Sequence, residues 1–484
     1  MIFFGLGGAF APEAALANGN VSHVMVIDFD INGIAELFCS KDYVKIMEDP
    51  RFSLWVDPDA QELKNFILEQ YRPVICGGIR TIPLRTRTVQ DTVCFDSAAT
   101  VIKEVIEKVS ADYSVQAHFG IRWFSNIIRN LKMAEAQSAF CPQGVNVPAI
   151  REAVICAAGP SLDIQMPMLA EQKRKGAFII SSDTAFPALL HSGIEPDAVV
   201  SIDCQHISYY HFKGLGSRNI PFFLDIASPP LLSQFSVSPF FFCGGHPLAL
   251  YACRFWRPLP QLDTSGGNVT YTCLSLAENL GAQRITLFGC DFSYPAGRTY
   301  ARGTYVYPYF TERQNRFAPV EAQHSSFLYR SPFLPCEEKK NYYETASLSF
   351  YRRGIEEKAA KMEAEITAVR GMGAVINLPK KKQHSFTGEN YGNKNTSFFT
   401  TDNAKMSYAD FLEQYRKDIS ALPLPAANGT GSYWQSLDEK SQLILATVLP
   451  LAAAVKHRNS GLQLCSLIEE VKCRCIAEID AVLS

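Results

Sequence analysis

Short apolar runs alternate with amphipathic segments through the middle of the chain. Most of these runs end at a glycine or an aspartate, as buried strands often do. The segments between them, such as 164–175 and 184–191, have helical periodicity. This alternation predicts a mostly parallel sheet with helices on both faces. The predicted strands are 154–158, 178–183, 199–203, 221–226, 240–243 and 284–288.

The first residues show a related pattern on a smaller scale. A strand at 2–4 is followed by the glycine turn 5–8, a helix at 12–16 and a strand at 24–28 that ends in Asp28. A glycine turn with an acid about 20 residues later is typical of dinucleotide and S-adenosylmethionine domains. The glycines depart from the strict spacing, so we expect a degenerate Rossmann-like domain without a cofactor. We interpret the DxD sequence at 28–30 as the end of the second strand rather than as a metal site.

The remaining segments predict helices more often than strands. We expect helices at 61–71, 98–108, 122–131, 342–370, 408–419 and 441–483, strands at 72–75 and 373–378, and a solvated polar loop at 380–403. The predicted fold class is therefore α/β: a central Rossmann-like, mostly parallel sheet flanked by helices, a smaller N-terminal α/β domain and a helical C-terminal tail. The predicted domains are 1–145, 146–380 and 381–484.

Composition narrows the class of protein further. The net charge of the 484-residue chain is −2, which gives no basic surplus for binding nucleic acid. The 14 cysteines include no CxxC pair, so we expect free thiols in a reducing cytoplasm and no metal site. The longest apolar run, 443–455, contains Pro450 and is too short to span a membrane. The first basic residue is Lys41, so a secretory signal is not expected.

Two small-residue corners at predicted helix starts suggest an anion-binding edge. The first is Gly159, Pro160 and Ser161, and the second is Ser265, Gly266 and Asn268. Free backbone N–H groups at a helix start favour a phosphate. The predicted strands end at the same edge in further polar or small residues, which are Asp183, Asp203, Gly244, Gly289 and Asp291. An aromatic loop that contains Tyr294 and Tyr300 follows Asp291.

Several of these segments together resemble a known bacterial family. The segments 158–162, 182–185, 193–197, 200–203, 266–269 and 288–294 resemble the motility accessory factor family, which is grouped with hydroxymethylpterin pyrophosphokinase-like proteins. The opening 4–8 resembles that family's N-terminal domain. The core is also similar to bacterial sialyltransferases that use CMP-sialic acid, through 159–162, 264–266, 289–292 and the pair His324-Ser325. It departs from them at Gly267-Asn268 and at Asp183, where they have an amide.

The resemblance implies an inverting transfer of a nonulosonic acid, a nine-carbon sialic-acid-like sugar, from its CMP donor to Ser or Thr of flagellin. It implies His324 as the base for the acceptor hydroxyl, with His246 and Asp203 as alternatives. Tyr294 and Tyr300 would donate hydrogen bonds to the departing phosphate. The nucleotide would be held by Gly159, Pro160, Ser161, Asp183, Asp203, Ser265, Gly266, Asn268, Gly289 and Asp291. No cofactor is required besides the donor, and Mg²⁺ is an optional ion.

Two other functions stay open. One is diphosphate transfer from ATP to 6-hydroxymethyl-dihydropterin, in which Asp183, Asp203 and Asp291 would hold Mg²⁺ among phosphate oxygens. The other is a non-catalytic flagellin-binding assembly factor with an idle nucleotide fold.

Overall fold

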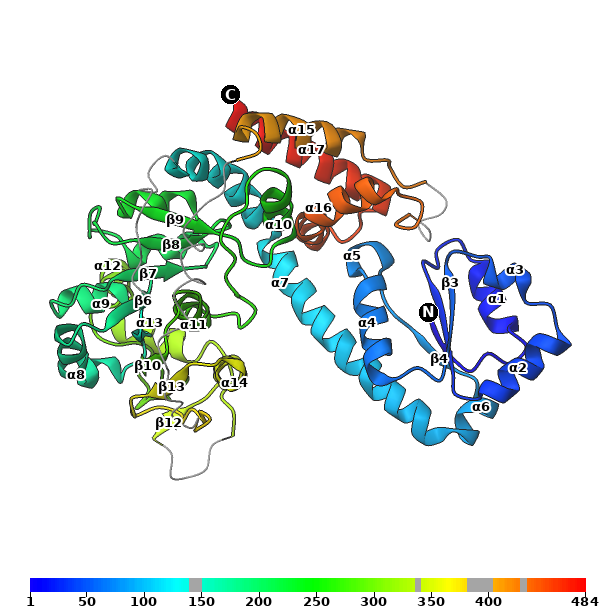
Figure 1. The fold of residues 1–484 in the computed structure, drawn as a ribbon, viewed down its shortest axis with the longest axis horizontal. Coiled ribbons are helices and arrows are strands. Elements are labelled where there is room, and N and C mark those ends of the chain that lie inside the picture. Colours follow the sequence, from blue (N-terminus) through cyan, green and yellow to red (C-terminus); the bar gives the residue numbers. More distant parts are fainter. Residues whose placement is uncertain (139–149, 336–340, 381–403, 427–432) are drawn as a thin grey trace, which may run out of the picture. The chain divides into compact units, whose positions relative to one another are not determined.

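A computed structural model describes residues 1–138, 150–335, 341–380, 404–426 and 433–484 (Figure 1). The chain divides into two compact units, which we describe separately. The first unit contains residues 1–124 and 412–484, and the second contains residues 125–411. None of the helices in the described ranges combines the length and apolarity needed to cross a membrane.

The first unit begins with a four-stranded sheet in the order β3-β2-β1-β4, in which every pair is parallel. The strands are β1 (Ile2–Phe4), β2 (Val24–Asp28), β3 (Phe52–Val56) and β4 (Thr81–Pro83). All residues of β1 and β2 are buried, as continuous apolar runs require in a sheet covered on both faces. The helices around it are α1 (Phe10–Leu16), α2 (Ile31–Ser40), α3 (Val44–Met47), α4 (Ala60–Gln70), α5 (Pro73–Cys76) and α6 (Arg85–Gln90).

Two predictions for this region are wrong in detail. The segment 72–75 was expected to be a strand, but residues from Pro73 onward form the short helix α5, since proline is favoured at the first turn of a helix. The helices expected at 98–108 and 122–131 are parts of a single 47-residue helix, α7 (Thr92–Ser138). The residues between them include no proline and a single glycine, Gly120. The sequence therefore has no signal that would end the helix there.

The predicted C-terminal tail is helical, but it shares a compact unit with the first 124 residues instead of standing alone. Its helices are α15 (Tyr408–Ala421), α16 (Glu439–Arg458) and α17 (Leu464–Leu483). The guanidinium of Arg72 lies 3.7 Å from the ring centroid of Trp434. Gly120 lies so close to the carbonyl of Pro450 that a side chain would not fit there. Contacts between segments this far apart in sequence leave no local pattern from which to predict them.

The second unit is built on a seven-stranded, all-parallel sheet in the order β13-β10-β5-β6-β7-β8-β9. The six strands predicted for this region all form, and the α/β class is confirmed. The direction of strand order reverses between β5 and β10, which is where ligands bind in sheets of this kind. The strands are β5 (Glu152–Cys156), β6 (Phe178–Ser182), β7 (Ala198–Ser201), β8 (Phe222–Asp225), β9 (Pro239–Phe242), β10 (Arg284–Phe288) and β13 (Glu365–Ala368).

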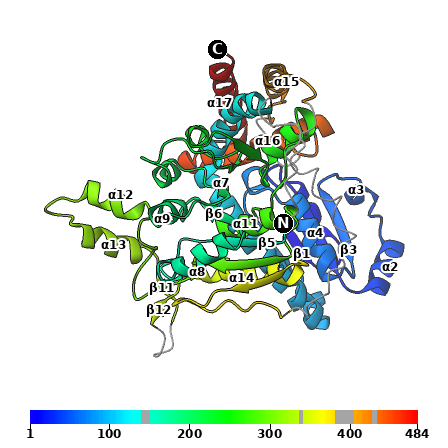
Figure 2. The same cartoon turned by 60° about the vertical axis from the view of Figure 1, so that its left-hand side comes forward.

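Helices cover both faces of this sheet (Figure 1). Residues of α11 and α14 pack in the hydrophobic core on one face, and residues of α8 and α9 pack in the core on the other. A helical hairpin of α12 and α13 extends beyond the sheet (Figure 2). The helices are α8 (Leu162–Arg174), α9 (Phe186–His191), α10 (Pro247–Phe255), α11 (Val269–Asn279), α12 (Val306–Arg313), α13 (Val320–Leu328) and α14 (Ala346–Lys361).

The region after residue 340 also differs from prediction. The helix expected at 342–370 is divided into β12 (Tyr342–Tyr343), which pairs with β11 (Tyr294–Pro295), then α14 and then the edge strand β13. The hydroxyl of Thr345 accepts a hydrogen bond from the Leu348 N–H and begins α14 there. The segment 373–378 is not a strand, because β13 takes the edge position beside β10. Most of the predicted loop at 380–403 lies outside the described residues.

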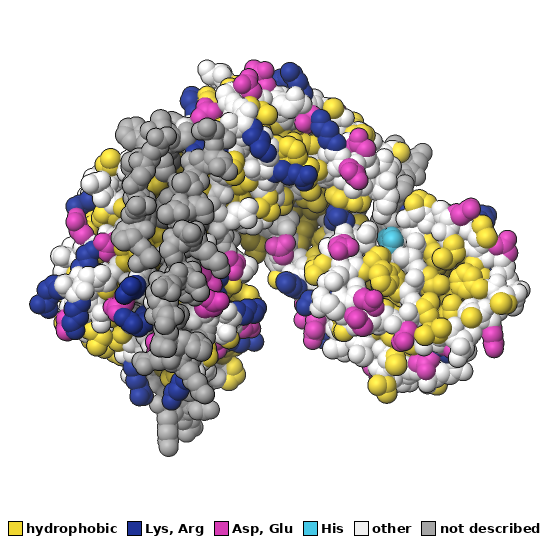
Figure 3. Space-filling view, in the orientation of Figure 1, with side chains coloured by type: hydrophobic (Ala, Val, Ile, Leu, Met, Phe, Trp, Pro, Cys, Tyr) yellow, Lys and Arg dark blue, Asp and Glu magenta, His cyan; other side chains and the backbone are white. Residues whose placement is uncertain are grey.

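On the face shown in Figure 3, acidic and basic side chains are interspersed in both units. This distribution agrees with a net charge of −2, which leaves no large excess of either sign. The face also shows hydrophobic side chains on the N-terminal domain.

Candidate active site at the carboxyl edge of the central sheet

The predicted site residues follow the strands of the central sheet at one common edge. Asp183 comes directly after β6, Asp203 follows β7, and Asp291 follows β10. Because all seven strands are parallel, their carboxyl ends meet at the same edge. The contacts of each side chain then decide which residues are brought together.

The first corner, at 159–161, is joined to Asp291. The Ser161 backbone N–H donates to Asp291 Oδ2 at 2.8 Å, and the Ser161 hydroxyl donates to Asp291 Oδ1 at 2.5 Å. Burial raises the pKa of the Asp291 carboxyl, and the hydrogen bonds from Ser161 act in the opposite direction. The start of α8, where the sequence suggested a bound phosphate, therefore holds a carboxylate of the chain itself.

The glycines at this corner allow two turns to pack closely. The Gly159 N–H donates to the Gly289 carbonyl at 2.8 Å. A Cβ at Gly159 would lie against that carbonyl and 2.5 Å from Asp291 Oδ2. Gly289 has a φ of +65°, and a Cβ there would collide with the carbonyl of Ala157. Pro160 is buried between these turns.

The second corner, at 263–268, precedes α11, and its residues Asp263, Ser265 and Gly267 are exposed. Asn268 caps the helix by accepting a hydrogen bond from the Tyr271 N–H at 3.0 Å. The Ser265 hydroxyl donates to Asp263 at 2.6 Å, and the Tyr271 hydroxyl donates to the other oxygen of Asp263 at 2.9 Å. Burial would raise the pKa of Asp263, but these hydrogen bonds and the charge of Lys358 outweigh it and lower the pKa to about 2.

Ser265 and Gly266 line a pocket of about 560 Å³ between α11 and α14. Residues of α14 that line it include Phe350, Arg353 and Lys358. The two corners therefore differ: Ser161 is buried against Asp291, whereas Ser265 is exposed beside this pocket.

Asp183 and Asp203 lie at the ends of the neighbouring strands β6 and β7. Asp183 is 1% exposed and accepts hydrogen bonds from the Thr184 N–H at 2.6 Å and from the Ser201 hydroxyl at 2.7 Å. Its carboxyl group is therefore held by donors from the turn after β6 and from β7. Asp203 is half-buried and accepts a hydrogen bond from the Gln205 N–H at 2.8 Å.

A group of tyrosines completes this part of the edge. The rings of Tyr300 and Tyr305 are 6.3 Å apart, and the charge of Asp183 acts on both phenols. Burial is the main cause that raises the pKa of Tyr300, and it raises the pKa of Tyr305 to about 12. Burial also raises the pKa of Tyr294. These phenols stay protonated at neutral pH and are available as hydrogen-bond donors.

Four residues of this edge were not singled out from the sequence. Arg330 acts electrostatically on Tyr294, Tyr300 and Tyr305 and on the phenol of Tyr351, a residue of α14. The ring of His211 lies 4.4 Å from that of Tyr305, and its Nδ1 is buried with no hydrogen-bond partner among the described residues. The sequence did not indicate these four residues, because none of them belongs to a recognisable local motif. The run of tyrosines 300–309 was the one signal that could have found Tyr305.

His324 lies on α13 inside the helical hairpin. Its ring packs 4.8 Å from Phe310 and 5.3 Å from Tyr307 of α12, and burial lowers its pKa. The Tyr307 hydroxyl donates to the Tyr300 carbonyl at 3.2 Å, so His324 is linked to the tyrosine loop through one residue. His246, the alternative base, accepts a hydrogen bond at Nδ1 from the Leu248 N–H, and burial lowers its pKa to about 3.

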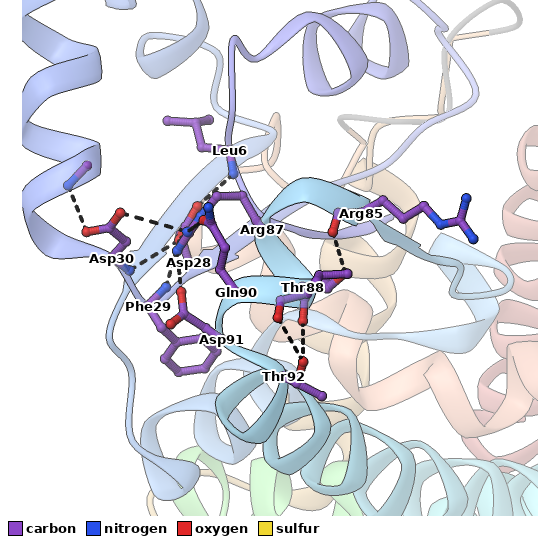
Figure 4. Close-up of polar contacts among 12 residues, drawn as sticks. Leu6, Asp28, Phe29, Asp30, Arg85, Arg87, Thr88, Gln90, Asp91 and Thr92 are labelled. Carbon is purple, nitrogen blue, oxygen red and sulfur yellow. Dashed lines mark hydrogen bonds and ion pairs between the residues drawn. The ribbon is translucent and has the colours of Figure 1, made fainter.

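The N-terminal glycine turn is contacted by the acid that ends β2, Asp28 (Figure 4). Asp28 accepts hydrogen bonds from the Leu6 N–H at 3.0 Å and from Arg87 at 2.9 Å, and Arg87 also pairs with Asp91 at 2.6 Å. Asp30 caps α2 through the Gly33 N–H at 2.8 Å. These contacts agree with the interpretation of 28–30 as a strand end. A pocket of about 450 Å³ lies beside them.

Within the described ranges, no group of three His, Cys, Asp or Glu side chains is arranged to hold a metal ion. In particular, Asp291 is joined to Ser161 and does not form such a group with Asp183 and Asp203. The cysteines for which a state is described are free thiols.

Parts of the chain are similar to known proteins. A model of the family described as 6-hydroxymethylpterin diphosphokinase MptE-like matches residues 123–297. Two proteins of Treponema pallidum (strain Nichols), both described as uncharacterized, are 46% identical over 89 residues and 34% identical over 143 residues. These alignments cover 18% and 30% of this chain, and only 31% and 66% of the two relatives.

A solved structure of a MAf glycosyltransferase from Magnetospirillum magneticum AMB-1 is similar over the whole chain. The TM-score is 0.55 at 13% sequence identity, and the match covers 100% of this chain and 77% of that one. At this identity the likeness concerns the fold.

Proposed function

The chain resembles the motility accessory factor family both in its sequence motifs and in its fold, and on this premise we propose that it is a glycosyltransferase. The observation that carries the proposal is the cluster formed by the rings of Tyr300, Tyr305 and His211 near the carboxyl edge of the sheet. Such an edge suits a reaction in which a phosphate leaves, because phenols can donate hydrogen bonds to the negative charge that develops.

The donor in this proposal is a CMP-linked nonulosonic acid and the acceptor is a Ser or Thr hydroxyl of flagellin. The donor class follows from the similarity of 159–162, 264–266 and 289–292 to sialyltransferases that use CMP-sialic acid. The bond between the anomeric carbon and the phosphate oxygen breaks, and the acceptor oxygen bonds to that carbon from the opposite side. The acceptor proton passes to a base, and CMP leaves with the electron pair of the broken bond.

In this mechanism the chain supplies positioning and proton transfer. His324 is the proposed base, since an imidazole can accept a proton near neutral pH. Asp203 and His246 are the alternatives. Tyr294 and Tyr300 donate to the leaving phosphate. The corner of Ser265, Gly266 and Asn268, where Ser265 is exposed, contacts the nucleotide directly. The buried Ser161–Asp291 pair holds the turn that follows β5. The free cysteines fit a reducing compartment such as the cytoplasm.

Calorimetry with CMP and with ATP, each with and without Mg²⁺, tests the donor class. We expect CMP to bind without Mg²⁺. Binding of ATP that depends on Mg²⁺ would instead favour diphosphate transfer to a pterin, the activity named in the family that matches residues 123–297. If the chain binds neither nucleotide, the result would favour the third function, a non-catalytic flagellin-binding assembly factor.

Mass spectrometry of flagellin incubated with the protein and a CMP-nonulosonic acid tests the transfer and its base. His324→Ala should lower the rate by about 10²- to 10⁴-fold while CMP binding is kept. His324→Gln keeps a planar polar side chain against Phe310 and should be equally slow, which separates loss of the base from loss of packing. His457→Ala, an exposed histidine near the end of α16, is the matched control. Full glycosylation by both His324 variants would rule out this base.

A further inference from the structure

Arg330 carries a positive charge that the described chain leaves uncompensated. Its exposed guanidinium forms no ion pair or hydrogen bond with a described residue, and it lies 4.4 Å from the ring centroid of Phe327. Two other arginines of this unit differ in this respect. Arg298 pairs with Asp163, and Arg352 pairs with Glu344 at 3.1 Å and with Glu356 at 3.5 Å.

A continuous row of rings connects Arg330 to the interior of the candidate site. From Phe327, the row passes to Tyr300 at 6.1 Å, to Tyr305 at 6.3 Å and to His211 at 4.4 Å. His211 is 6% exposed, and the absence of a described partner for its Nδ1 marks a polar group inside the wall that the fold itself does not satisfy. The row therefore joins a solvent-facing cation to a buried polar group through two phenols.

The charges at this edge explain why such a cation is needed. Asp183 and Asp203 lie at the same edge, and their negative charges repel a phosphate diester. A donor phosphate needs a positive charge in reach to overcome that repulsion, and the planar fork of a guanidinium matches phosphate oxygens in two parallel hydrogen bonds.

We propose that Arg330 is the phosphate-binding residue of this site, and that it holds the donor's phosphate against the wall formed by Tyr300 and Tyr305. The inference rests on the proposed use of a nucleotide donor, but not on the identity of the base or the sugar. In this inference Arg330 binds the phosphate directly, and the phenols of Tyr300 and Tyr305 contact the same phosphate from the other side. Binding through the guanidinium predicts that affinity depends on the phosphate and weakens as salt rises.

Calorimetry on the full chain tests this with CMP, ATP and the two nucleosides cytidine and adenosine. Arg330→Gln should weaken binding of the nucleotide by about 10- to 100-fold and leave nucleoside binding unchanged. Arg330→Lys should restore part of the affinity, because it returns the charge but not the bidentate geometry. Arg316→Gln is the matched control, since Arg316 is an exposed arginine in the loop between α12 and α13, and it should bind like the wild type.

The outcomes separate this inference from the proposed function. If Arg330→Gln binds CMP as tightly as the wild type, the inference is overturned and the transferase proposal stands. If the wild type binds ATP but not CMP, and Arg330→Gln loses that binding, the inference stands and the CMP donor is wrong. If the wild type binds no nucleotide more tightly than its nucleoside, both are overturned. Circular dichroism of each variant, compared with the wild type, shows whether the fold is kept.

Discussion

The Asp291 carboxylate accepts hydrogen bonds from both the backbone N–H and the hydroxyl of Ser161, a residue 130 positions earlier in the chain. The pair ties the turn after β10 to the start of α8, on either side of the point where the strand order reverses. The Met372 N–H donates to the same Ser161 hydroxyl at 2.7 Å, which adds the segment after β13. Three loops of the site are thus held by one serine.

The two serines of the two corners should respond differently to substitution. Ser161→Ala leaves the buried Asp291 carboxylate with one donor fewer and the Met372 N–H without its acceptor, so we expect it to lower the free energy of unfolding by about 1–3 kcal/mol. Ser265→Ala, at an exposed position, should change it by less than about 0.5 kcal/mol. Urea unfolding of both variants measures the difference. Equal stabilities would contradict the structural role given to Ser161.

Gly159→Ala should be destabilising because of the close approach of the Gly289 carbonyl and the Asp291 side chain. Overpacking of this kind costs about 1–3 kcal/mol. Gly245→Ala is the control, since a Cβ at that position meets nothing within 4 Å. Thermal unfolding of the two variants gives the comparison, and a Gly159→Ala variant as stable as Gly245→Ala would show that the turns can move apart without cost.

Acidification should destabilise the first unit through His23. Burial, followed by the charge of the N-terminal ammonium, lowers the pKa of His23 to about 4. The unfolded chain takes up a proton near pH 6.5 and the folded chain does not, so stability is lost as pH falls from 6.5 towards 4. The slope is at most about 1.4 kcal/mol per pH unit.

His23→Gln removes this titration and should flatten that slope, while its amide can still reach the Ser53 hydroxyl that His23 contacts at 2.9 Å. Hydrogen exchange of β1 and β2 amides between pH 7 and pH 5 reports on this unit. An unchanged slope in the variant would assign the acid sensitivity to other groups.

Asp225 should give the second unit a pH dependence of opposite sign. Burial raises the pKa of this carboxyl to about 7, against a hydrogen bond donated by the Ala227 N–H at 2.8 Å. The folded chain keeps the proton that the unfolded chain releases near pH 3.8, so this contribution to stability is lost as pH rises from about 4 to about 7.

Asp225→Asn mimics the protonated form, and we expect it to be more stable than the wild type at pH 8 and close to it at pH 4. Urea midpoints at the two pH values measure the effect, with Asp203→Asn, a half-buried carboxylate at the neighbouring strand end, as the comparison. A variant that is less stable at pH 8 would mean that the charged carboxylate has a stabilising partner.

The sequence determined the elements wherever the physical signal is local. Short apolar runs between helical segments predicted six of the seven strands of the central sheet and their parallel direction, because burial on both faces requires continuous apolar strands. The same rule placed Asp183, Asp203 and Asp291 at one edge. It failed at 72–75 and 342–370, where a single proline or a threonine cap determined the local structure.

Only the tertiary structure decided what those residues contact. Ser161 was expected to face a phosphate and instead holds Asp291, and the C-terminal helices share a compact unit with the first residues of the chain. Arg330 and His211 join the tyrosine edge through ring contacts between segments that have no common sequence pattern. Periodicity records the environment of each segment, but the pairing of side chains across a fold depends on how the segments pack, which is a property of the whole chain.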